Sequence, residues 1–150
     1  MPILKMNPSM TQQNIISGEH EVKIAGIIKE TTGFVITSAL IGLLKKKDYS
    51  IFLDKINLRS LLFILEKQIE FLIIDIDNLT ETCRYYLEIV KRTRPRLPII
   101  ILMLDPSAKS AVSLREIGIK YYAIKPLSLK ELTEILEVAF RIGGKERNSR

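Results

Sequence analysis

Two carboxylates that directly follow a run of apolar residues are the strongest candidates for chemistry in this chain. The stretch from Glu70 to Leu79 reads EFLIIDIDNL, so Asp75 and Asp77 come after four successive apolar residues. A carboxylate in such a place can help to hold a divalent cation or can act as a nucleophile. It can also be a buried acid that a nearby cation neutralises, which is a structural role.

The same apolar run predicts a strand in the centre of a parallel sheet. Residues Phe71 to Ile74 show no polar alternation, which is typical of strands that are covered on both faces. In open α/β sheets, ligands bind beyond the carboxyl ends of the strands. Asp75 is therefore expected at the edge of the sheet where the sites of this architecture lie.

Four other apolar segments predict strands, and amphipathic segments between them predict helices. The other strands are expected at 22–28, 49–53, 99–104 and 121–124. The expected N-caps of the helices are Asn57, Thr80, Asp105 with Pro106 in the first turn, and Ser128 with Glu131 as its capping-box partner. About five strands alternating with five helices indicate the α/β class, as a doubly wound five-stranded parallel sheet with helices on both faces.

The chain is long enough for one domain with a single core. Residues 1–21 are polar and contain Pro2 and Pro8, which predicts a flexible N-terminal tail. Residues 22–141 hold all the expected strands and helices and form the predicted domain. Residues 142–150 are predicted to be a flexible basic C-terminal tail.

The composition, with 47% hydrophobic and 27% charged residues, is that of a soluble globular protein. The single cysteine, Cys83, cannot build a disulfide framework, and His20 lies in the tail, so no cysteine chemistry is expected. No secretion signal is recognisable. The apolar run 34–44 is shorter than the roughly 20 residues that span a bilayer. We therefore expect a cytoplasmic protein without a membrane span.

A formal net charge of +6 and a pI near 9.5 would favour anionic partners. The lysines and arginines are nevertheless scattered along the sequence, so a solvated surface is the preferred interpretation and nucleic acid is not expected as a partner. Binding of nucleic acid through the basic tail and the lysine clusters stays as a third hypothesis, because such contacts are mainly electrostatic.

The first helix is expected to be apolar around much of its circumference, from Phe34 to Leu44. These side chains cannot all face one sheet, so some of them are expected to contact another chain or the tail. A homodimer is one arrangement that would cover them.

Three motifs together resemble the receiver domain of two-component response regulators, which has a flavodoxin-like fold. They are EFLIID, PIIILML from Pro98 to Leu104, and GIKYYAIKPL from Gly118 to Leu127, and the resemblance covers roughly residues 22–141. It implies that Asp75 is the phospho-accepting aspartate and Lys125 the charge-stabilising lysine. It also implies that Tyr122 is the switch aromatic and that the bond before Pro126 is cis.

The sequence departs from that family at two places. The family has a pair of acids after the first strand, and here the corresponding pair is Glu30-Thr31 or Thr31-Thr32, depending on the alignment. At most one carboxylate remains, so the candidates for holding magnesium are Asp75, Asp77 and Glu30. Met103 stands where the family has a switch serine or threonine, and a thioether cannot donate a hydrogen bond.

We therefore expect a stand-alone, degenerate receiver-like domain that acts by binding a protein partner, such as a sensor histidine kinase or a downstream effector. No enzymatic activity and no cofactor are expected. The alternative is a working receiver that a histidine kinase phosphorylates on Asp75, with Lys125 stabilising charge and Glu30 or Asp77 holding Mg²⁺.

Overall fold

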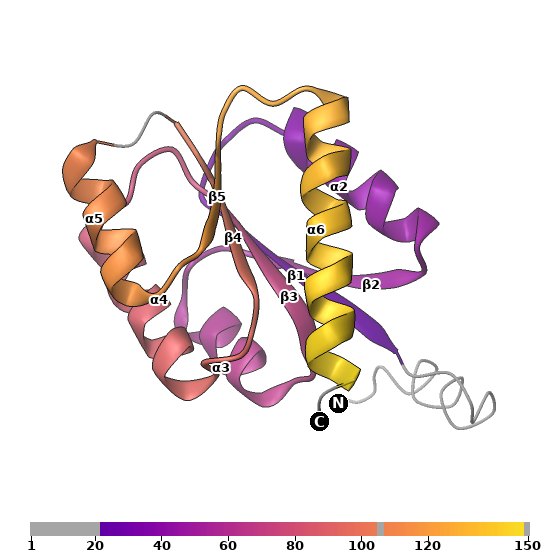
Figure 1. Cartoon of the computed structure of the whole chain (residues 1–150), viewed down its shortest axis with the longest axis horizontal. Helices are drawn as coiled ribbons and strands as arrows, with labels where there is room; N and C mark the ends of the chain where they lie inside the picture. The colour runs from indigo at the N-terminus through magenta and orange to yellow at the C-terminus, as the bar shows by residue number, and fades with distance from the viewer. Residues whose placement is uncertain (1–21, 105–106, 149–150) are drawn as a thin grey trace.

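The computed structural model describes residues 22–104 and 107–148, and of residues 144–148 the backbone alone. Five parallel strands form one sheet in the order β2-β1-β3-β4-β5 (Figure 1). The strands are β1 (Lys23–Lys29), β2 (Tyr49–Asp54), β3 (Ile69–Asp75), β4 (Ile99–Met103) and β5 (Tyr121–Ile124). This confirms the predicted fold class.

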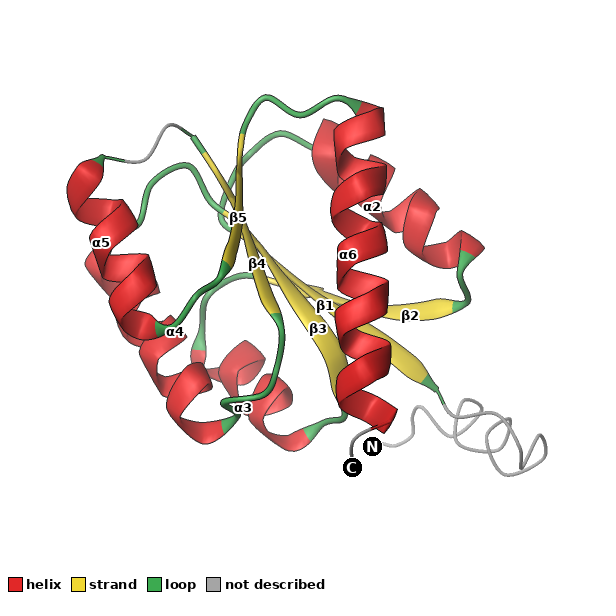
Figure 2. Ribbon diagram, viewed as in Figure 1, coloured by secondary structure: helices red, strands yellow, loops and turns green. Residues whose placement is uncertain are grey.

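Five helices cover the two faces of this sheet (Figure 2). They are α2 (Val35–Lys46), α3 (Leu58–Glu66), α4 (Glu81–Thr93), α5 (Ala108–Ile117) and α6 (Leu129–Asn148). Buried side chains of α2 and α6 share one core with one face of the sheet, and those of α3, α4 and α5 share a second core with the other face. Strand β3 lies between the two cores and is buried along its whole length.

The helices begin where short polar side chains can bond the free backbone N–H groups of the first turn. Asn57 caps α3, Thr80 caps α4, and Ser128 and Glu131 form the expected capping box of α6. The prediction for α5 is wrong, because Ser107 is its N-cap and accepts a hydrogen bond from the Ser110 backbone. A serine two residues after Asp105 caps equally well, and residues 105–106 lie outside the described part of the chain.

Helix α6 continues past the expected end of the domain at residue 141 and reaches Asn148. This last part of α6 packs closely on β3. Gly143 is buried, and a Cβ atom on it would lie 3.2 Å from the Glu70 carbonyl oxygen. The predicted N-terminal tail, with His20, lies outside the described residues.

Many of the apolar side chains of α2 pack in the core that this helix shares with α6. Leu40 and Leu44 are buried, while Ile36, Ile41 and Leu43 pack partly against the core that α2 shares with α6. At the start of the helix, Phe34 and Val35 remain exposed. None of the helices in the described part of the chain is long and apolar enough to cross a bilayer.

Candidate functional site

Asp75 ends β3 at the carboxyl edge of the sheet, and its carboxylate is bonded to Lys125. The Lys125 Nζ donates to Asp75 Oδ1 at 2.7 Å and lies 3.2 Å from Asp77 Oδ1. Lys125 follows β5, so its side chain crosses the end of β4 to reach Asp75. Both partners are buried, with Asp75 only 2% exposed, so the pair is shielded from water.

The second carboxylate oxygen of Asp75 is also occupied. The Thr31 hydroxyl, from the loop after β1, donates to Asp75 Oδ2 at 3.1 Å. In the same loop, the Glu30 backbone N–H donates to the Asp75 carbonyl oxygen. Both side-chain oxygens of Asp75 therefore accept hydrogen bonds from this chain.

Lys29 also belongs to this site, although it was not among the residues predicted from the sequence. Strand β1 runs one residue further than expected, which makes Lys29 the register partner of Asp75. Its side chain is buried, its Nζ donates to the Thr31 carbonyl oxygen, and it lies 4.7 Å from the centroid of the Phe34 ring. The sequence feature that could have predicted this position is a lysine directly after the apolar residues of a strand. A cation thus stands at the end of β1, beside the Asp75 position.

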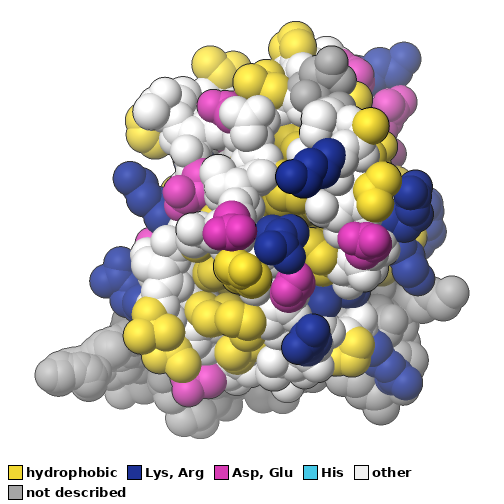
Figure 3. Space-filling model, turned by 90° about the vertical axis from the view of Figure 1, so that its left-hand side faces the viewer, with side chains coloured by type: hydrophobic (Ala, Val, Ile, Leu, Met, Phe, Trp, Pro, Cys, Tyr) yellow, Lys and Arg dark blue, Asp and Glu magenta, His cyan; other side chains and the backbone are white. Residues whose placement is uncertain are grey.

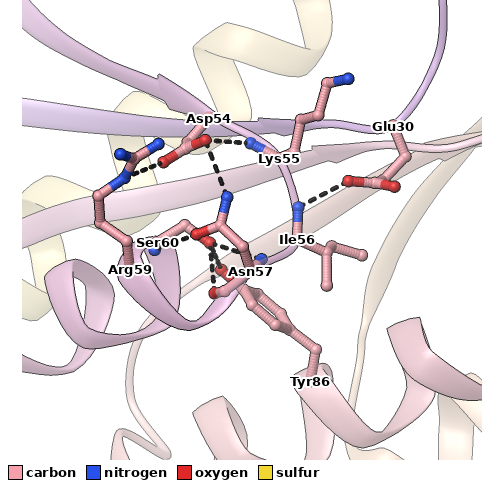
Figure 4. A network of polar contacts seen from close by, with 8 residues as sticks. All are labelled: Glu30, Asp54, Lys55, Ile56, Asn57, Arg59, Ser60 and Tyr86. Atoms are coloured by element: carbon pink, nitrogen blue, oxygen red, sulfur yellow. Dashed lines mark hydrogen bonds and ion pairs between the residues drawn. The ribbon is translucent and has the colours of Figure 1, made fainter.

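Glu30 is turned away from Asp75. Its Oε2 accepts a hydrogen bond of 2.6 Å from the Ile56 backbone N–H, in the loop between β2 and α3 (Figure 4). The carboxylate thus ties the loop after β1 to the start of α3.

The loop that Glu30 reaches belongs to a polar network that joins α3 to α4 (Figure 4). Ser60 Oγ lies 2.7 Å from Tyr86 Oη and also bonds the backbone of Asn57. Burial raises the pKa of Tyr86 to about 12, so its phenol stays protonated at neutral pH. The Lys55 backbone N–H, with Asn57 and Arg59, lowers the pKa of the Asp54 carboxyl, so Asp54 stays charged. The side chains of this network are therefore engaged in structural contacts.

The predicted magnesium ligands do not converge. Among the described residues, no three His, Cys, Asp or Glu side chains are grouped as a metal ion requires. Glu30 and Asp77 line a hollow of about 190 Å³, and Asp75 is not among its described lining residues. Magnesium needs a near-octahedral oxygen shell. The donor set of the described residues does not fit that ion, because Glu30 bonds the Ile56 backbone and no third carboxylate is grouped with Asp75 and Asp77.

Cys83 also lines this hollow, but its chemistry is suppressed. Burial raises the pKa of the Cys83 thiol to about 12. The nucleophilic form of cysteine is the thiolate, which is scarce at neutral pH when the pKa is that high. A much larger hollow, of about 750 Å³, lies between α4 and α5 and is lined by both acids and bases. It lies away from Asp75 and does not enlarge the site.

Comparisons with known proteins identify the fold. No protein-family model and no curated protein sequence match this chain. A response regulator receiver domain protein (CheY-like) from Methanospirillum hungatei matches with a TM-score of 0.69 at 19% identity, covering 84% of this chain and 99% of that one. A response regulator from Thermotoga maritima matches with a TM-score of 0.65 at 16% identity, covering 81% and 99%. The beryllofluoride-activated NtrC4 receiver domain dimer gives 0.65 at 20%, covering 81% and 99%.

This chain has the fold of a response-regulator receiver domain. At identities of 20% or below, the shared property is the fold, so the chemistry of the site follows from this chain's own residues.

The other residues that the resemblance singled out are Met103, Pro126 and Tyr122. Met103 ends β4 with its side chain buried in the core on the α3, α4 and α5 side, and its carbonyl oxygen accepts from the Lys125 backbone at 2.7 Å. The peptide bond between Lys125 and Pro126 is cis. Tyr122 on β5 is 46% exposed and faces solvent.

Proposed function

We propose that this chain is a signalling domain of the response-regulator type that binds a protein partner without being phosphorylated on Asp75. The observation that carries the proposal is the occupied carboxylate. Both Asp75 oxygens accept hydrogen bonds from side chains, and the group is buried.

Phosphoryl transfer to an aspartate needs a carboxylate oxygen that can approach phosphorus in line and cations that offset the charge of the transferring oxygens. Here each Asp75 oxygen already accepts a hydrogen bond, from Lys125 and from Thr31, so an incoming phosphoryl group would compete with these contacts for the buried carboxylate. A magnesium ion would also meet the buried ammonium of Lys29 at the end of β1. These contacts support a structural role for the Asp75 to Lys125 pair.

The position that would report phosphorylation supports the same proposal. A switch needs a hydroxyl that can bond a phosphoryl oxygen, and Met103 has none. Its side chain is instead packed among buried apolar residues of β3, β4 and α4. A partner would therefore recognise one fixed shape.

The exposed side of β5 is the surface that we propose for the partner. Tyr122 and Ile124 are 46% and 47% exposed, and Leu104 after β4 and Val112 on α5 are also exposed. Figure 1 shows α5 beside α4 on the left of the sheet. Figure 3, which looks onto α4 and α5, shows apolar side chains gathered between charged ones. Exposed apolar patches with polar rims are typical of protein interaction sites.

Phosphotransfer from a small phosphodonor tests the proposal. The purified chain is incubated with the donor and Mg²⁺, and its intact mass is measured at intervals. We expect no phosphoryl adduct, in the wild type or in the Asp75→Asn variant. A wild-type adduct that is absent from Asp75→Asn would establish the working receiver instead.

A further inference from the structure

The edge of the sheet opposite Asp75 concentrates positive charge. Because all five strands are parallel, the loops that enter them and the last turns of the helices meet at this edge, which we call the amino edge. The exposed cations there are Lys45, Lys46, Lys47, Lys67, Arg92, Arg96, Arg115 and Lys120. The exposed acids there, among the described residues, are Asp48, Glu66 and Glu116.

Helix dipoles account for only part of this charge. Cations in the last turn of a helix offset its negative end, and that explains Lys45 and Lys46 in α2, Arg92 in α4 and Arg115 in α5. Arg96 and Lys120 lie beyond the helix ends, in the loops that enter β4 and β5. Neither bonds to any residue that the structure describes, so both charges are available to a ligand.

Two hollows flank Arg96 at this edge. One, of about 270 Å³, is lined by Lys91, Arg96, Lys120 and Tyr121, with no acidic side chain among its described lining residues. The other, of about 310 Å³, lies on the far side of the loop between α4 and β4 and is also lined by Arg96. Arg96 therefore stands on a ridge between two depressions.

This ridge is held in place by hydrogen bonds. The guanidinium of Arg94 donates to the carbonyl oxygens of Ile64 and Lys67 at 2.8 and 2.9 Å, which ties the loop to the end of α3. The Nζ of Lys91 donates to the Pro95 carbonyl oxygen at 3.1 Å. The side chain of Arg96 is thus presented from a fixed loop, which lowers the entropy lost on binding.

We propose that the amino edge binds single-stranded nucleic acid, with Arg96 and Lys120 contacting phosphates and Tyr121 stacking on a base. Basic grooves with an aromatic platform are typical of such sites. The hollow of about 270 Å³ offers three cations and one exposed aromatic ring, which are the groups that contact phosphates and stack on an unpaired base. An anionic bilayer fits less well. Membrane binding needs apolar side chains that insert, and Tyr121 is the only exposed large apolar side chain at this edge among the residues that the structure describes.

This binding is independent of the proposed partner surface and of Asp75. Tyr122 and Ile124 lie on the α5 side of β5, whereas Tyr121 lies on the side of α6, as the alternation of the strand requires. The phosphodonor experiment therefore does not bear on the nucleic-acid site, and failure of either proposal leaves the other standing.

The test is fluorescence anisotropy of a labelled single-stranded oligonucleotide of about 12 residues, titrated with the full chain at several salt concentrations. Wild type is expected to bind with an affinity that falls steeply with salt. The double variant Arg96→Gln/Lys120→Gln is expected to bind at least about tenfold more weakly, with a salt slope lower by about 1.4, since each single-strand phosphate contact contributes about 0.7. Tyr121→Leu is expected to weaken binding with an unchanged salt slope.

The matched control is Lys55→Gln/Lys130→Gln, which removes the same charge from exposed positions at the carboxyl edge. It is expected to keep wild-type affinity, with circular dichroism confirming that all variants are folded. Absence of binding at low salt, or equal losses in the two double variants, would overturn the proposal. So would equal affinity for a duplex of the same length, or stronger binding to phosphatidylserine vesicles than to the oligonucleotide.

Discussion

At the scale of single residues, Asp75 and Lys125 form a buried ion pair at the carboxyl edge of the sheet. Removing two charges from water costs several kcal/mol for each ion, and their attraction offsets this only when the hydrogen bonds are well formed. Here Lys125 bonds Asp75 at 2.7 Å, and Thr31 bonds the second oxygen. Each Asp75 oxygen thus accepts one hydrogen bond that stabilises its buried charge.

The variant Lys125→Met is expected to lower the free energy of unfolding by about 3–5 kcal/mol, because it leaves the Asp75 carboxylate buried without its cation. The double variant Asp75→Asn/Lys125→Met is expected to recover most of this loss, since no unpaired charge remains. Urea denaturation followed by circular dichroism measures both changes.

An exposed lysine provides the control for this pair. Lys130→Met, in the first turn of α6, is expected to change stability by no more than about 0.5 kcal/mol. If Lys125→Met proves as stable as the wild type, the pair does not hold the site together.

At the scale of elements, helix α6 packs so closely on β3 that a side chain at residue 143 would be crowded. A Cβ atom there would lie 3.2 Å from the Glu70 carbonyl oxygen and 3.4 Å from Phe71. The glycine of α2, Gly42, is exposed, and a Cβ atom on it would have no neighbour within 4 Å. The two helical glycines thus differ in environment and not in backbone conformation.

We expect Gly42→Ala to raise the free energy of unfolding by about 0.5–1 kcal/mol, because alanine loses less backbone entropy in a helix than glycine does. Gly143→Ala is expected to give no gain or a loss, since the methyl group would press on the backbone of β3. Thermal denaturation of the two variants side by side compares these effects. An equal gain in both would contradict the close packing of α6.

At the scale of the whole molecule, the two edges of the sheet have different characters. The carboxyl edge holds the neutralised Asp75 site, with exposed acids and bases in similar numbers around it. The amino edge is predominantly basic, and the flank of β5 is apolar. The two surfaces that we propose, one for a protein and one for an anionic polymer, are therefore separate.

The protein surface can be located with a photoreactive amino acid at Tyr122. In cells that make the protein, we expect it to form a crosslink to one discrete partner, and the crosslink to persist in an Asp75→Asn background. The same amino acid at Leu53, which is exposed on β2 at the opposite edge of the sheet from β5, is the control and is expected to give none. Loss of the crosslink in Asp75→Asn would mean that the interaction depends on the aspartate.

The sequence by itself determined which elements form and in what order. Apolar runs without alternation mark buried strands, and residues such as Asn57 and Thr80 mark helix starts, because these signals act between neighbours in the chain. The N-cap of α5 was not predicted correctly, because Asp105 and Ser107 are both good capping residues. The meeting of Asp75 with Lys125 followed from the resemblance and from the parallel order of the strands.

The tertiary structure alone decided what the side chains at the two edges touch. Whether Glu30 faces Asp75 or Ile56, and whether Lys29 is buried, depends on contacts between segments far apart in the sequence. The basic amino edge is the clearest case. Its cations are scattered along the chain, and only a parallel sheet, which brings every strand start to one side, collects them into a surface.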